Sequence, residues 1–377
     1  MQTSRTPASG QVIPVFALAL LAIVAMGALV LEGGNAYAQQ RVAQNGSDAA
    51  ANAGALVIGE TLGPNGATRT DDDVDAAVTN IATQNDLDNH IAYYTDVSGK
   101  YVNNSGAVVA AAADAAIVGN ADGVSTIPAT AQGVRVTGTR TFGTTFGRAI
   151  GFTTLDASAD ATAVAGRLTG GAFLPVIFPV NITDCDNSGD LGVGESQWVL
   201  SQPDGPDADT NPEGNKYIIP LCKTGDGAFQ VLDLDPTLSC DEEAAGGVSV
   251  FWPVLPVDVP VDPGNDCAKK VADAVNAPPI QGSIVLIPIC EVDCTTDGGA
   301  NGEYTIVKIT AFFIDYLHHQ NGGNAAECQG DGTTTFRITG NGSSSCVVGW
   351  FVRYISSGPV GVGPVGETDA IGVQLIR

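Results

Sequence analysis

The sequence VIPVFALALLAIVAMGALVL, residues 12–31, decides how this chain is organised. It contains no charged residue. A helix of about 20 residues is about 30 Å long, which is the thickness of the hydrocarbon core of a bilayer. The stretch therefore predicts a transmembrane helix over residues 12–31, preceded by a short cytoplasmic N-terminus, residues 1–11.

The helix is expected to continue outward through residues 32–60, although Gly33, Gly34 and Gly46 are places where it could bend. Apolar and small residues recur along it at spacings of three, four and seven positions. They are Leu31, Ala38, Val42, Ala49, Ala53 and Leu56. This spacing places them on one stripe of a helix, and small side chains allow close packing. We therefore expect the stripe to pack against another helix or against the rest of the chain.

Two other fates of the apolar run remain open. A cleaved signal peptide agrees with the weak positive charge at Arg5 and with the Ala36–Ala38 A-x-A sequence, after which the mature protein would begin at Gln39. Processing after Gly10 would resemble that of prepilins, but these carry a glutamate at the position of Val15. The run is longer than the usual hydrophobic region of a signal peptide, about 7 to 15 residues, and this length favours a retained anchor.

Acidic residues dominate the composition. Lys and Arg total 16 against 41 Asp and Glu, which gives a formal net charge of -25. This balance excludes nucleic acid as an expected partner, because phosphate binding needs a basic surface. The single arginine before the run, Arg5, gives a weak positive-inside signal. We expect a single-pass cell-membrane protein with a cytoplasmic N-terminus and an extracytoplasmic C-terminal domain.

Residues 61–165 predict a small, pilin-like α+β region. Thr70 followed by three aspartates, Asp71 to Asp73, is typical of a helix start, and we prefer this interpretation to a cation site. Residues 91–95 and 100–102 predict a hairpin. Residues 134–164 predict a strand, a short helix and a second strand, because residues 155–165 alternate strictly between apolar and polar. This region is expected to pack on the long N-terminal helix.

Residues 166–377 predict a β-rich, cysteine-containing domain. Short apolar runs recur between turn-rich segments, at residues 176–180, 283–289, 305–316, 347–355 and 372–376. The chain as a whole is therefore expected to have an α+β fold that ends in a disulfide-rich all-β domain.

All eight cysteines lie in this second half: Cys185, Cys222, Cys240, Cys267, Cys290, Cys294, Cys328 and Cys346. An even number of cysteines after an export or anchor segment indicates disulfides in an oxidising compartment, with a pairing that the sequence does not determine. Zinc is not expected, since the chain contains no C-x-x-C pair and has just three histidines.

One segment has the pattern of an EF-hand calcium loop. Residues 184–195 place acidic or hydroxyl side chains at five loop positions: Asp184, Asp186, Ser188, Asp190 and Glu195. Gly189 occupies the position of the sharp turn, but no clear entering helix precedes the loop. The alternative interpretation is an acidic surface turn. Ca²⁺ is thus the single cofactor that we consider.

The N-terminal region carries a set of residues in a recognisable order: Arg5, Gly10–Gln11, Glu32, Tyr37, Gln40, Arg41, residues 48–51 and residues 53–55. In these residues it resembles the TadE/TadG-like proteins of the bacterial Flp (tight-adherence) pilus-assembly system. Asn52 stands where the family usually has leucine. A second fragment, Val134 to Val164, is also similar to this family.

The resemblance implies a membrane-anchored structural or assembly component of the pilus, with the membrane and other pilus-assembly proteins or pilus subunits as partners. We expect no enzyme and no small-molecule substrate, because motifs such as G-x-S-x-G, H-E-x-x-H and the phosphate loop are missing from the sequence. The alternative is a secreted or cell-surface binding protein, such as a calcium-stabilised adhesin, released by signal-peptide cleavage.

Overall fold

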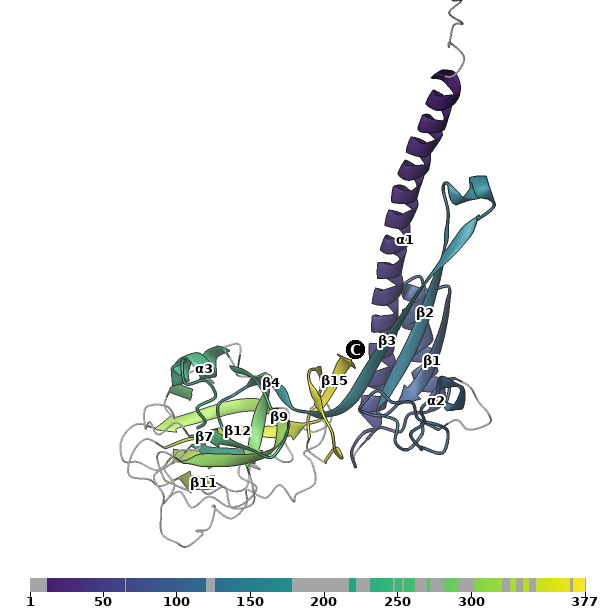
Figure 1. The fold of residues 1–377 in the computed structure, drawn as a ribbon. Helices are drawn as coiled ribbons and strands as arrows, with labels where there is room; N and C mark the ends of the chain where they lie inside the picture. Colours follow the sequence, from purple (N-terminus) through teal and green to yellow (C-terminus); the bar gives the residue numbers. More distant parts are fainter. Residues whose placement is uncertain are drawn as a thin grey trace, which may run out of the picture. The chain divides into compact units, whose positions relative to one another are not determined.

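The computed structural model describes residues 12–64, 66–119, 126–177, 217–221, 231–246, 248–252, 254–261, 270–271, 280, 282–290, 302–320, 326–329, 335–338, 344–366 and 369–376. The chain divides into two compact units (Figure 1). The first comprises Met1–Ala55, Thr70–Ala163 and Leu375–Arg377, and the second comprises Leu56–Arg69 and Val164–Gln374. A long apolar helix followed by β-sheets confirms the predicted α+β class.

The first unit contains most of the helical structure. Its elements are α1 (Val12–Thr61), α2 (Asp71–Gln84), β1 (Asn89–Thr95), η1 (Ala112–Asp114), β2 (Gly133–Gly143), η2 (Gly147–Ile150) and β3 (Thr154–Leu168), of which α1 and β3 continue into the second unit. Strands β1 and β2 pair antiparallel, and β3 follows β2 in the sheet. Figure 1 shows α1 beside β2 and β3, with its N-terminal part continuing beyond them.

Helix α1 is continuous through all three glycine positions at which a bend was considered. Pro14 lies in its first turn, where the missing N–H has no intrahelical partner in any case. At 50 residues the helix is about 75 Å long.

The face of α1 that packs on the first unit differs from the predicted stripe. Small residues are buried, namely Ala43, Gly46, Ser47, Ala50, Ala51, Gly54 and Ala55. Leu31, Val42 and Leu56 of the predicted stripe are instead exposed. The buried set is offset by about one position, or about 100° around the helix. A Cβ atom on Gly54 would lie 2.8 Å from Val78 Cγ2 and 2.9 Å from Val134 Cγ2, so only the smallest side chains fit at this contact.

The predicted helix start at Thr70 is confirmed. The Thr70 side chain accepts a hydrogen bond from Asp73 N, and the Asp73 carboxylate accepts one from Thr70 N at 2.8 Å, which completes a capping box. The predicted turn between residues 95 and 101 is also present, since Asp96 N donates to Lys100 O at 2.8 Å and Thr95 bridges to Tyr101.

The predicted strand, short helix and strand of residues 134–164 correspond to β2, η2 and β3. Along β3 the alternating alanines are buried, namely Ala157, Ala159, Ala161 and Ala163. Asp156, Ser158 and Asp160 between them are exposed. The contact with α1 is confirmed, because Ser47 Oγ donates to Ala159 O at 3.1 Å.

The described elements of the second unit are largely strands. They are β4 (Gly170–Phe173), β5 (Tyr217–Leu221), α3 (Cys240–Gly246), β6 (Val248–Phe251), β7 (Val257–Pro260), β8 (Ile284–Cys290), β9 (Glu303–Gln320), β10 (Ala326–Gln329), β11 (Thr335–Ile338), β12 (Ser344–Val352), β13 (Ile355–Ser357), β14 (Val360–Gly361) and β15 (Ile371–Ile376). The largest sheet has the order β5-β12-β9-β8-β4-β6, with β7 paired to β9. Strands β8, β9, β12 and β15 coincide with four of the predicted apolar runs.

The core of the second unit lies on this sheet. Phe173 stacks on Trp252 with ring centroids 4.9 Å apart, and Phe313 stacks on Trp350 at 4.4 Å. The remaining predicted strand is residues 176–180. Its Val176 forms a β-bridge to Val231, and residues 178–180 lie outside the described residues. Cys240 and Cys290 each take part in a disulfide bond.

Candidate functional site

The apolar part of α1 is the first candidate. Its large side chains are exposed at Ile13, Val15, Phe16, Leu18, Leu20, Leu21, Ile23, Val24, Met26, Leu29, Val30 and Leu31. Within the part of the chain that the structure describes, α1 is the one helix long and apolar enough to cross a membrane, and none of its most apolar window is buried. An exposed apolar surface of this length suggests a membrane anchor.

The first polar residue after the apolar run is fixed in place by the first unit. The Glu32 carboxylate accepts hydrogen bonds from Thr145 N at 3.0 Å and from Gly147 N at 3.2 Å. Both donors belong to the β2–β3 connection, residues 144–153, which contains η2. The sequence analysis included Glu32 in the family resemblance but did not find its partners, because they contribute only backbone N–H groups.

Polar contacts then hold α1 to the sheet. Gln44 Nε2 donates to Asp160 O at 3.2 Å, one residue from the Ser47 contact at Ala159. The Asp160 carboxylate in turn accepts from Arg135 Nε at 3.1 Å and Thr137 Oγ1 at 2.9 Å. The hydrogen bond to Asp160 raises the pKa of Arg135. This network joins α1, β2 and β3.

A small cavity of about 440 Å³ lies beside α1, just past the apolar run. Its lining residues are Gly33, Ala36, Tyr37, Gln40, Phe142, Leu155, Asp156, Ala157 and Ser158. Tyr37 also accepts a hydrogen bond from Arg41 Nη2 at 2.8 Å, one helical turn further along. Tyr37 and Gln40, which the resemblance singled out, thus lie on α1 beside Phe142 of β2 and the first residues of β3, and Arg41 contacts Tyr37.

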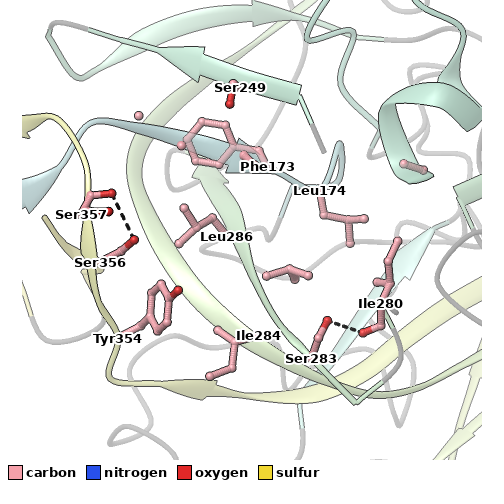
Figure 2. Close-up of a pocket in the computed structure, with 15 residues that line it drawn as sticks. Phe173, Leu174, Ser249, Ile280, Ser283, Ile284, Leu286, Tyr354, Ser356 and Ser357 are labelled. Carbon is pink, nitrogen blue, oxygen red and sulfur yellow. Dashed lines mark hydrogen bonds between the residues drawn. The ribbon is translucent and has the colours of Figure 1, made fainter. Parts of the chain in front are cut away.

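A larger cavity of about 650 Å³ lies in the second unit, where β4 and β8 run side by side (Figure 2). Phe173, Leu174, Ile284 and Leu286 form its apolar wall. Two of its serine hydroxyls are already used, since Ser283 Oγ donates to Ile280 O at 2.5 Å and Ser356 Oγ donates to Ser357 O at 3.2 Å. Among the described residues that line the cavity, Tyr354 is the one that carries a titratable group.

The three aspartates at the start of α2 have separate structural roles. Asp71 is buried and accepts hydrogen bonds from the Tyr94 hydroxyl at 2.6 Å and from Gly119 N at 3.0 Å. Burial and this hydrogen bond raise the pKa of Tyr94. Asp73 belongs to the helix cap and Asp72 is exposed. Among the described residues no group of three or more His, Cys, Asp or Glu could hold a metal ion.

The predicted calcium loop, with Asp184, Asp186, Ser188, Asp190 and Glu195, lies outside the described residues. The same holds for Cys185, Cys222, Cys267 and Cys294. Cys328 lies in β10 and Cys346 in β12. The pairing of the eight cysteines and the calcium loop therefore stay predictions.

Comparison with known proteins gives one match. The model of a family described as Flp pilus-assembly TadE/G-like matches residues 10–57. This confirms the expected resemblance for the apolar run and most of the remainder of α1, while the second similar fragment, Val134 to Val164, lies outside the match. No curated protein and no solved structure matches the chain.

Proposed function

We propose that this chain is a membrane-anchored structural component of a Flp-type pilus or of its assembly complex, with an extracytoplasmic head. The observation that carries the proposal is the division of α1. Large apolar side chains cover the part before Glu32 and are exposed, whereas small side chains after residue 42 are buried on a folded unit. This arrangement suits an anchor that is rigidly joined to its head.

The family match supports the assembly role. A pilus-assembly family implies the membrane and other pilus components as partners. Leu31, Val42 and Leu56 remain exposed on α1 beside the buried face. They form an apolar stripe on which a helix of a neighbouring subunit could pack. The role proposed for the chain is therefore structural, and no catalytic step is assigned to it.

The orientation follows from charge and from the cysteines. The weak positive signal at Arg5 favours a cytoplasmic N-terminus, and a net charge of -25 with eight cysteines beyond the run favours the outside for the remainder. We propose that the chain's disulfides, which include those of Cys240 and of Cys290, form in the oxidising compartment and involve the other cysteines as well.

The anchoring proposal is tested by fractionating cells that express the native chain and by sequencing its mature N-terminus. We expect the protein in the membrane fraction, resistant to carbonate extraction, with residues 12–31 retained. Recovery in the medium or the soluble fraction with a sequence that begins at Gln39 would contradict the anchor and favour a secreted binding protein. Protease added to intact cells with a permeable outer layer should degrade the head, and protection of the head would contradict the orientation.

Calcium binding by residues 184–195 remains a separate proposal, supported by the spacing of its five oxygen-bearing side chains. Added Ca²⁺ should raise the melting temperature of the full chain in detergent, and the Asp184→Ala variant should lose this shift. Asp114→Ala, which removes an exposed aspartate of η1, is the matched control and should keep it. The same Ca²⁺ response in wild type and Asp184→Ala would exclude the loop.

A further inference from the structure

We propose that the β2–β3 connection, residues 144–153, is a second membrane contact that rests in the lipid headgroup layer where α1 leaves the bilayer. This inference depends on the proposed anchoring of α1 and adds a lipid-contacting surface on the folded unit. The surface consists of the connection itself together with Tyr37 of α1.

The height of the connection along α1 is set by Glu32. This residue directly follows Leu31, the last residue of the apolar run, and its carboxylate binds Thr145 N and Gly147 N. A helix rises about 1.5 Å per residue, so the connection lies within one turn of the level at which the hydrocarbon core would end. Figure 1 shows the turn between β2 and β3 extending alongside the projecting part of α1.

The side chains at this level are those of a membrane interface. Phe152 is 61% exposed, Phe146 is 37% exposed and Tyr37 on the adjacent helix is 60% exposed. Aromatic residues gather where hydrocarbon meets headgroups, because the ring is apolar and its edge or hydroxyl tolerates water. Arg148 is also exposed and lies between the two phenylalanines in sequence, where a guanidinium can bind a lipid phosphate.

Hydrogen bonds hold the connection in a defined conformation, so the exposure of the Phe146 and Phe152 rings is a property of its fold. Thr144 N donates to Thr153 O at 3.1 Å, and Phe152 N donates to Gly147 O at 2.9 Å. Gly151 adopts a left-handed conformation with φ of 95°, which closes the turn after η2. Phe146 and Phe152 are therefore presented without a large entropic cost of ordering on binding.

The local charges permit this contact although the chain as a whole is strongly acidic. Carboxylates beside the connection are engaged in hydrogen bonds: Glu32 accepts from the two N–H groups, and Asp156 accepts from the Thr141 hydroxyl at 2.7 Å. The surface adjoins the end of the apolar run, and its large exposed side chains are the three aromatic rings and Arg148, so it fits a lipid bilayer better than a charged protein partner. Its binding should depend little on salt.

The test uses tryptophan fluorescence of the full chain reconstituted into phosphatidylcholine vesicles, with or without bromine on the upper part of the acyl chains. Bromine quenches tryptophan only at short range. Three variants are compared: Phe152→Trp in the connection, Leu29→Trp in the apolar run, and Val108→Trp at a site of the first unit that is 51% exposed and outside the connection. The three native tryptophans all belong to the second unit, and the wild type provides their background.

We expect brominated lipid to reduce the emission of Phe152→Trp nearly as much as that of Leu29→Trp, and to leave that of Val108→Trp at the wild-type background. Quenching of Leu29→Trp without quenching of Phe152→Trp overturns this inference alone and leaves the anchor in place. A blue-shifted but unquenched Phe152→Trp would show that protein covers the site, which also overturns it. Failure to quench Leu29→Trp overturns both this inference and the proposed anchoring.

Discussion

Helix α1 has two parts with different surroundings, although it is one continuous helix. We call residues 12–31 its outer part and residues 43–55 its inner part. Before Glu32 the side chains are large, apolar and exposed, as at Leu21 and Leu29. Between residues 43 and 55 the inward face is alanine, glycine and serine, buried on β2, β3 and α2. Lipid accepts any apolar side chain, whereas a sheet fixed at a set distance accepts only certain sizes. The two parts should therefore respond to opposite kinds of substitution.

The largest effect is expected for a charge in the outer part. Leu21→Arg places a guanidinium near the middle of the apolar run, at a cost of about 2.5 to 3.5 kcal/mol for membrane insertion. We expect a large fraction of the protein to leave the membrane fraction, as measured by fractionation and immunoblotting. Leu21→Met keeps the apolar character and is the control. Equal membrane recovery of the two variants would show that the run is no anchor.

The inner part should instead be sensitive to a single added methyl group. Gly54→Ala creates contacts below 3.0 Å with Val78 and Val134, and overpacking of this kind costs about 1 to 3 kcal/mol. Gly34→Ala is the matched control, because nothing lies within 4 Å of its added Cβ and alanine favours a helix by about 1 kcal/mol. Thermal unfolding in detergent should show a lower melting temperature for Gly54→Ala and an unchanged or higher one for Gly34→Ala. The reverse order would place the helix on a different face.

A third difference concerns pH. The raised pKa of Tyr94 means that its neutral form is favoured in the folded first unit, while the unfolded tyrosine ionises near pH 10. The stabilisation is thus fully present below about pH 10 and is lost as the pH rises further, by up to about 1.4 kcal/mol per pH unit. The proposed anchor contains no titratable group between residues 12 and 31, so membrane retention should not change over this range.

Tyr94→Phe isolates this effect from the other tyrosines. The variant should be about 1 kcal/mol less stable at pH 8, because the hydrogen bond to Asp71 is lost. It should then lose less stability than the wild type between pH 9.5 and 11. Parallel pH profiles of melting temperature for the two proteins would contradict the assigned role of Tyr94.

The elements of the first unit could be predicted because apolar, polar and capping residues are clearly separated in their sequence patterns. The apolar run has no charge, Thr70 and Asp73 have capping side chains, and residues 155–165 alternate between alanine and polar residues. The inward face of α1 could not be predicted for the opposite reason. Alanine and glycine occur all around residues 43–55, so the pattern is compatible with several faces, and the choice depends on how closely Val78 and Val134 approach.

The contacts of Asp71 and Glu32 could not be predicted for another reason. Asp71 meets a tyrosine hydroxyl 23 residues further along the chain, and Glu32 meets backbone groups 113 and 115 residues away. Backbone N–H groups are present at nearly every residue and leave no trace in the sequence. Acidic residues after an apolar run or in a first helical turn have ordinary explanations, which is why their partners appear only in the folded structure.

The smallest expected effect lies at the junction of the two parts of α1. Glu32→Gln keeps the shape and one acceptor oxygen but replaces charge-assisted hydrogen bonds with neutral ones, a difference of about 1 kcal/mol. Hydrogen exchange at Thr145 and Gly147 should become a few-fold faster, while exchange in the β1–β2 ladder is unchanged. Glu60→Gln removes a carboxylate that pairs with Arg69 in the second unit and should leave both amides unaffected. If Glu32→Gln exchanges at the wild-type rate, the carboxylate does not fix the connection, and the boundary between the exposed apolar part and the sheet-facing part of α1 must be set by packing alone.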